Sequence, residues 1–268
     1  MNNELTVVMI TKNEEYHIKD AIESALKFAV SVVIVDSGST DKTVDIAREL
    51  GAVVFFKTFR SFGEQWNYAI THTNIETKWV MKLDPDERIN HELASELFKL
   101  NESCNGFYIH RRLWFMGGPL PVYDKVLRIW KLGTCKFTNN LVNEHPVVSG
   151  TVGTLNGVIE HLDSRDLSHW IEKQNRYTTF EAVSRLRNKH LAFEPNFWGD
   201  KRERNAFFKS IFLKVPFRYQ INFILLLFKV KIWVSGRRGY NWALQRNWAR
   251  RMVELKLNEM KQKNDNDG

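Results

Sequence analysis

The chain has 268 residues, which is enough for one large domain, or one domain with an appendage, around a hydrophobic core. Its hydrophobic content of 43% and its charged content of 26% are those of an ordinary globular protein. Two cysteines, Cys104 and Cys135, are too few for a disulfide framework or a zinc site, so we expect a reducing environment. The first residues show no basic segment followed by an apolar core, and a secretory signal is not expected.

The net charge of +8 is distributed unevenly along the chain. Residues 201–263 contain 16 Lys and Arg against three Asp and Glu, whereas residues 1–200 are slightly acidic. This asymmetry indicates an anionic partner for the basic end, either nucleic acid or a membrane surface. We therefore predict a body over residues 1–200 and a basic helical extension over residues 201–268.

The first hundred residues predict alternating strands and helices. Four short apolar runs rich in β-branched residues are typical of strands buried on both faces. These strands are expected at 5–10, 31–36, 52–56 and 78–84. Helical spacing of apolar residues is found within 14–28, 41–52 and 63–73. Ser39 or Thr40 is the expected N-cap of the second helix. Strand–helix–strand units of this length predict an α/β fold, with a Rossmann-like, mostly parallel sheet and helices on both faces.

The remaining sequence predicts mixed strands and then helices. Residues 105–160 contain short strand-like pieces separated by Gly, Pro and Asn, which suit a cover over one edge of the sheet. Helical patterns return from Asp166 onward. The apolar run at 221–228 is far shorter than the about 20 residues that a bilayer span needs. Its surroundings of Lys, Arg and Trp fit either a segment lying in the interface of an anionic membrane or a core helix with a solvated basic face.

Polar clusters follow three of the predicted strands. They are TKNEE (11–15), DSGSTDKT (36–43) and DPDE (84–87). The carboxyl ends of parallel strands share one edge of a sheet, where open α/β folds bind ligands. The sequence has neither a P-loop nor a dinucleotide glycine fingerprint, so a bound diphosphate would need a divalent cation. Asp84 and Asp86 offer the carboxylate oxygens that such a cation prefers.

Two further carboxylates lie in the second polar cluster. Asp36 closes a predicted strand before a glycine-containing turn, and we expect its carboxylate to be free to accept hydrogen bonds from a ligand. Asp41 is expected only to favour the dipole of the helix that follows.

Four segments resemble the family 2 glycosyltransferases, which are inverting enzymes of the GT-A fold. The segments are VVMITKNEE (7–15), VIVDSGSTDKT (33–43), EQWNYAI (64–70) and WVMKLDPDE (79–87). They follow the family's pattern in order and at similar spacing, strongly over about the first 90 residues and more loosely beyond. The resemblance implies a GT-A catalytic domain over residues 1–200. It also implies a nucleotide-sugar donor, most often a UDP-sugar, with Mn²⁺ or Mg²⁺ between its diphosphate and the acidic motif.

The resemblance also implies roles for individual residues. The residues expected around the nucleoside are Thr11, Asn13, Glu14 and Asp36. Asp84 is expected near the ribose and within the candidate metal set, and Asp86 is expected to be the principal metal ligand. Gln65 and Asn67 match a segment that lines the donor pocket, with a role on the helix surface as the alternative. His161 is a further candidate metal ligand or diphosphate contact, with a structural role as the alternative.

An inverting transfer needs a general base within hydrogen-bond reach of the acceptor hydroxyl. Relatives carry an acidic residue after the donor-binding half, and Glu144 in NLVNEHP (140–146) is the candidate at a comparable point. Its alternative role is that of a plain loop carboxylate beside His145. Asp124 is the next candidate for the base.

These implications describe a bacterial enzyme that moves a hexose from a UDP-sugar to a saccharide or lipid-linked saccharide acceptor, in lipopolysaccharide or surface polysaccharide biosynthesis. We expect it to be cytoplasmic and peripheral on the inner face of the cytoplasmic membrane, with an anionic membrane surface and no nucleic acid as partner. A nucleic-acid-binding protein is one alternative, but the basic end has no recognisable binding module. A sugar nucleotidyltransferase is the other, but it would show a glycine-rich, Arg-containing loop where this chain has TKNEE.

Overall fold

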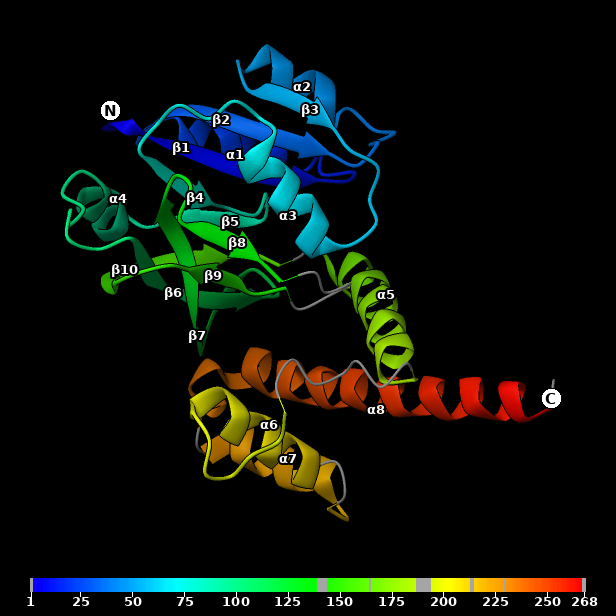
Figure 1. Ribbon diagram of the computed structural model, residues 1–268. Coiled ribbons are helices and arrows are strands. Elements are labelled where there is room, and N and C mark those ends of the chain that lie inside the picture. Colours follow the sequence, from blue (N-terminus) through cyan, green and yellow to red (C-terminus); the bar gives the residue numbers. More distant parts are fainter. Residues whose placement is uncertain are drawn as a thin grey trace. The chain divides into compact units, whose positions relative to one another are not determined.

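The computed structural model describes residues 2–138, 144–163, 165–186, 194–212, 215–228 and 230–266 (Figure 1). The chain divides into two compact units, Met1–Arg165 and Asp166–Gly268, which are described separately below. This division differs from the boundary at residue 200 predicted from the sequence, because α5 (Leu167–Leu186) contacts α8 (Gly236–Asn266) of the C-terminal unit. The functional assignment of the two regions stays a prediction.

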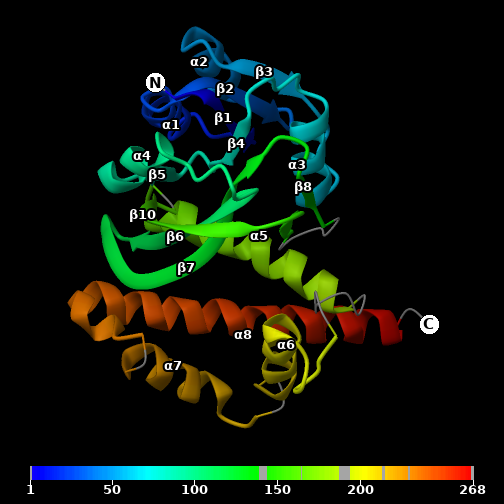
Figure 2. The same ribbon diagram turned by 60° about the vertical axis from the view of Figure 1, so that its left-hand side comes forward.

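An eight-stranded sheet forms the centre of the N-terminal unit, in the order β3-β2-β1-β4-β7-β6-β10-β5. The strands are β1 (Asn2–Thr11), β2 (Ala29–Asp36), β3 (Val53–Phe56), β4 (Trp79–Lys82), β5 (Glu87–Ile89), β6 (Gly106–Phe115), β7 (Gly118–Lys131) and β10 (Val152–His161). The first four strands pair in parallel, whereas β7 is antiparallel to both β4 and β6. Figure 2 shows β6 and β7 as long, bent strands below this parallel half. The predicted α/β fold with a mostly parallel sheet is confirmed.

Two hydrophobic clusters cover the two faces of the sheet. Val7 and Met9 of β1 point into the cluster shared with α1 (Ile18–Ala25), α2 (Thr43–Glu49) and α4 (His91–Leu97). Val8 points to the opposite face, where it joins Trp66 of α3 (Phe62–Thr71) and Phe137 of β8 (Cys135–Phe137). Because successive side chains of a strand alternate between faces, continuous apolar strands require helices on both sides. β8 pairs with β9 (Pro146–Val148) in a separate two-stranded sheet.

The predicted N-cap of the second helix is wrong. α2 begins at Thr43, after Lys42, and neither Ser39 nor Thr40 occupies the N-cap. Asp41 instead accepts hydrogen bonds from the backbone N–H and the hydroxyl of Thr43, at 3.0 and 2.5 Å. Ser39 and Thr40 are engaged in contacts between loops that are described with the candidate site.

The C-terminal unit is helical in its described residues. In addition to α5 and α8 it contains α6 (Lys201–Phe212), α7 (Arg218–Phe228) and the short 3₁₀ helix η1 (Ile232–Ser235). Lys256 of α8 donates hydrogen bonds to the carbonyl of Asn175 at 2.7 Å and to the hydroxyl of Thr179 at 2.8 Å, which ties α8 to α5. Among the described residues, no helix combines the length and the apolar character needed to cross a bilayer.

Candidate active site

The loops that follow β1 and β2 are joined by reciprocal hydrogen bonds. The backbone N–H of Asn13 donates to the hydroxyl of Ser39, and the side-chain oxygen of Asn13 accepts from the backbone N–H of Thr40, each at 2.8 Å. The backbone N–H of Glu14 donates to the hydroxyl of Thr43 at 2.7 Å. Asn13 has a φ of 58°, in the left-handed region that Asn tolerates better than most residues. The TKNEE and DSGSTDKT clusters therefore form one continuous, hydrogen-bonded rim at the carboxyl ends of β1 and β2.

Asp36 is completely buried beneath this rim. Its carboxylate accepts hydrogen bonds from the hydroxyl of Thr11, from the backbone N–H groups of Gly38 and Ser39, and from the hydroxyl of Ser39, at 2.5 to 2.8 Å. A buried carboxylate needs such donors because burial removes its water. The expectation of a free carboxylate is therefore wrong. Asp36 shapes its own turn and holds Thr11, and its contact with a nucleoside stays a prediction.

Gln65 and Asn67 both connect α3 to neighbouring segments. Gln65 is fully buried, which excludes the alternative of a helix-surface role, and its amide nitrogen donates to the hydroxyl of Ser37 at 3.0 Å. Asn67 exchanges two hydrogen bonds with the backbone of Phe137, at 2.9 and 2.8 Å. Asn67 thereby fixes the end of β8, where the loop that carries Glu144 begins. Contacts of Gln65 and Asn67 with a donor stay predictions.

The DPDE segment joins β4 to β5 and is surrounded by basic side chains. Asp84 lies 3.0 Å from the guanidinium of Arg128, which also pairs with the completely buried Glu87. Burial acts to raise the pKa of Asp84, but the charges of Lys82 and Arg128 outweigh it and lower that pKa to about 2. Asp84 is therefore ionised at neutral pH. Arg128 was not expected as part of the site.

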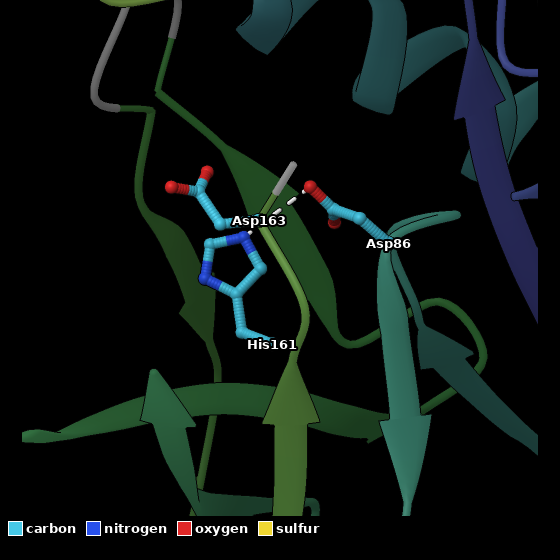
Figure 3. A group of neighbouring side chains, drawn as sticks. All are labelled: Asp86, His161 and Asp163. Carbon is cyan, nitrogen blue, oxygen red and sulfur yellow. Dashed lines mark hydrogen bonds and ion pairs between the residues drawn. The ribbon is translucent and has the colours of Figure 1, made fainter. Parts of the chain in front are cut away.

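Asp86 of this segment forms a cluster with His161 and Asp163 (Figure 3). The ring nitrogen Nε2 of His161 lies 3.3 Å from a carboxylate oxygen of Asp86, and one ligand atom of each of the three residues lies within 4.8 Å of the others. The cluster arises because β10 pairs with β5, which places His161 opposite Glu87. Asp84 does not belong to this cluster of described residues.

The charge environment of His161 differs from that of an isolated buried histidine. Burial acts to lower the pKa of His161, but the negative charge of Asp86 and the hydrogen bond to it prevail, so that the pKa is raised. Asp163, two residues further on, was missed by the sequence reasoning, and its only signal is its position after His161 in HLD. Two carboxylates and one imidazole are donors that suit a divalent cation such as Mn²⁺ or Mg²⁺.

Glu144 and Asp124 lie in different surroundings. Glu144, in the loop between β8 and β9, is largely buried and lies 2.9 Å from the ammonium of Lys82. Lys82 ends β4, and its ammonium also lies 4.3 Å from the ring centroid of Trp66. Asp124 is largely exposed on β7 and pairs with Arg111 at 3.2 Å. The structure therefore connects Glu144 to the strand that leads into the DPDE segment and leaves Asp124 at an exposed position of β7.

Comparisons with known proteins agree with these features. The family model described as "Glycosyl transferase family 2" matches residues 6–157. An uncharacterized glycosyltransferase of Rickettsia bellii is 26% identical over 96% of this chain and 92% of its own length. The lipopolysaccharide core biosynthesis glycosyltransferase LpsC of Rhizobium meliloti is 28% identical over 88% of this chain and 85% of its own.

Among solved structures, glucosyl-3-phosphoglycerate synthase of Mycobacterium tuberculosis aligns with a TM-score of 0.43 and 15% identity, over 68% of this chain and 79% of that chain. The family model covers more than half of the chain, and the chain has the α/β architecture expected of the GT-A fold. The chain belongs to glycosyl transferase family 2.

Proposed function

We propose that this protein is an inverting hexosyltransferase that moves a hexose from a UDP-sugar to a saccharide or lipid-linked saccharide acceptor. The observation that carries the proposal is the cluster of Asp86, His161 and Asp163 beside Asp84, because a UDP-sugar brings a diphosphate that needs a cation. The similarity to a relative named for lipopolysaccharide core biosynthesis supports a role in lipopolysaccharide or surface polysaccharide synthesis. Such an acceptor would place the enzyme at the inner face of the cytoplasmic membrane, as a peripheral protein.

The proposed metal site consists of Asp86, His161 and the additional residue Asp163. A bound Mn²⁺ or Mg²⁺ would stabilise the negative charge that develops on the leaving diphosphate. The ionised carboxylate of Asp84 is assigned to the ribose, in keeping with its place outside the cluster. The joined loops around Thr11, Asn13 and Glu14 are assigned to the nucleoside.

Glu144 is the proposed general base. Its carboxylate would take the proton of the acceptor hydroxyl while the hydroxyl oxygen bonds to the anomeric carbon. On the opposite face of the sugar, the bond from that carbon to the diphosphate oxygen breaks, and its electron pair leaves with UDP. Two observations favour Glu144 over Asp124: Glu144 is largely shielded from water, and Lys82 holds its carboxylate in place. A base must keep a defined position relative to the hydroxyl that it deprotonates.

A transfer assay tests this proposal. UDP release from a panel of UDP-hexoses is followed with Mn²⁺, in the presence and absence of lipopolysaccharide-core or lipid-linked saccharides. We expect acceptor-dependent release of UDP from at least one donor. Glu144→Gln keeps the size of the side chain but cannot take a proton, so turnover should fall about 10²-fold or more with donor affinity unchanged.

The matched variant Asp124→Asn should keep most of the activity, since Asp124 is exposed and paired with Arg111. Normal turnover in Glu144→Gln together with a large loss in Asp124→Asn would transfer the base role to Asp124. Absence of UDP release with every donor and acceptor tested would contradict the proposed donor class.

A further inference from the structure

Helix α7 presents a row of apolar side chains to the solvent. Its exposed apolar residues recur at helical spacing, with Ile221, Ile224, Leu225 and Phe228 on one side of the helix. We call these four residues the α7 stripe. Phe228, the last residue of α7, is 71% exposed, which is unusual for a side chain as large and apolar as phenylalanine.

Other side chains of α7 contact α8 through aromatic and polar interactions, and the ring centroids of Phe223 and Tyr240 lie 5.7 Å apart. Arg218 forms an ion pair with Glu254, and the buried side chain of Asn222 hydrogen-bonds to Asn247 and Arg250. Figures 1 and 2 both show α7 running alongside α8. An ordinary surface helix turns its apolar residues toward the core, whereas the four residues of the α7 stripe face the solvent. A core helix with a solvated basic face, the alternative predicted from the sequence, does not account for the exposure of the α7 stripe.

The segment that follows α7 extends this surface. Trp233 and Val234 of η1 are 60% and 63% exposed, the exposed Lys231 directly precedes η1, and the exposed Arg237 is the second residue after it. Residues 204–253 contain eleven Lys and Arg and no Asp or Glu. The exposed apolar groups are thus flanked by positive charge that no acidic residue of residues 204–253 neutralises.

We propose that the α7 stripe and η1 form a docking surface for an anionic lipid bilayer. α7 would lie in the plane of the interface, with the stripe among the acyl chains and Trp233 at the level of the headgroups. Lys231 and Arg237 would face the anionic headgroups. The proposal adds an attachment surface to the proposed function, and it holds or fails independently of the donor and of the base.

The charge distribution favours lipid over other partners. A symmetric dimer through this surface would bring two basic rims together, because a two-fold interface places the same patch on both copies. A nucleic acid would match the charge and could stack on Phe228 and Trp233, but it would leave the aliphatic side chains of Ile221, Ile224 and Leu225 in water. An anionic bilayer satisfies both the aliphatic stripe and its basic flanks.

Vesicle co-sedimentation of the full chain tests the proposal. Vesicles of phosphatidylcholine alone are compared with vesicles that contain about one third phosphatidylglycerol, at low salt and at about 0.5 M NaCl. We expect binding to the anionic vesicles that weakens with salt. The double variant Ile224→Ser/Phe228→Ser should bind about tenfold more weakly or worse, because it removes two apolar side chains from the stripe.

Two controls make the result specific. Phe56→Ser/Phe98→Ser removes two exposed phenylalanines of the N-terminal unit and should bind as the unmodified protein does. Brominated lipids should quench the tryptophan fluorescence of the unmodified protein, and Trp233→Phe should reduce that quenching. The second measurement leaves the stripe intact, so it remains informative if the serine variant does not fold.

Equal binding of the unmodified protein to neutral and anionic vesicles would overturn the proposal. Unchanged vesicle binding by Ile224→Ser/Phe228→Ser would overturn it as well. A protein that binds RNA but no vesicles would assign the basic surface to nucleic acid. A dimer that binds no vesicles and that Ile224→Ser/Phe228→Ser converts to a monomer would assign the stripe to self-association. None of these measurements needs a nucleotide, so failure here leaves the proposed transfer reaction untouched.

Discussion

Lys82 connects the two halves of the candidate active site at the scale of single residues. Its ammonium pairs with Glu144, while its charge acts together with that of Arg128 to keep Asp84 ionised against the effect of burial. The aromatic ring of Trp66 adds a cation–π contact. The position of the proposed base and the charge of the donor motif therefore depend on the same side chain.

Replacing Lys82 with Met should lower the free energy of unfolding by about 3 kcal/mol, because Glu144 would remain largely buried without its partner. The double variant Lys82→Met/Glu144→Gln should recover part of that loss, since it removes the unpaired charge. Urea denaturation of the two single variants and the double variant measures this coupling. Strictly additive effects would show that the pair does not act as a unit.

The side chains of the site differ in how readily the sequence reveals them. Asp84 and Asp86 are conspicuous because acidic residues around a proline follow an apolar run. His161 lies 75 residues after Asp86 and reaches it only through the pairing of β10 with β5. Asp163 has only a weak local signal, its position two residues after His161 at the end of a strand. Side chains that meet through long-range strand pairing are therefore the least predictable.

At the scale of secondary-structure elements, β7 supports the DPDE segment through one buried ion pair. Arg128 of β7 is only 3% exposed and reaches both Glu87 of β5 and Asp84. β7 is also the antiparallel neighbour of β4, which leads into the same segment. The geometry of the acidic motif thus depends on β7, whose Arg128 lies 44 residues after Asp84 in the chain.

Arg128→Met should destabilise the N-terminal unit by about 3–5 kcal/mol, because Glu87 would stay buried without its partner. For a unit of this size, the melting temperature should fall by roughly 10 °C. Lys125→Met on the exposed side of the same strand is the matched control and should change it little. Similar melting temperatures for Arg128→Met and the unmodified protein would contradict a supporting role of the pair.

Elements in the first hundred residues are more predictable than β6 and β7. Parallel strands buried on both faces are continuously apolar, and the helices between them have a clear period, so both signals are local. β7 extends over 14 residues and includes Gly118, Pro119 and Pro121, which interrupt a strand pattern in the sequence. The sequence therefore predicts only its apolar second half.

At the scale of the whole molecule, the proposed catalytic residues and the proposed membrane-docking surface lie in different units. All proposed donor, metal and base residues lie in the N-terminal unit, Met1–Arg165. The α7 stripe and its basic flanks lie in the C-terminal unit, Asp166–Gly268. The net charge predicts this division in part, but the charge change near residue 200 does not coincide with the structural boundary. α5 is moderately polar, and only its contact with α8 assigns it to the second unit.

The measurement that tests the central claim most directly is UDP binding by thermal shift, with and without Mn²⁺. It compares the unmodified protein with Asp86→Asn and Asp163→Asn, and with Asp45→Asn on the exposed surface of α2 as the control. UDP at about 100 times its Kd should add roughly 2.7 kcal/mol of stability, which corresponds to a shift of several degrees. We expect this shift only with Mn²⁺, and we expect it to be retained by the control and lost in the two cluster variants. A shift that is independent of Mn²⁺, or one that survives in both cluster variants, would contradict a donor site built on Asp86, His161 and Asp163.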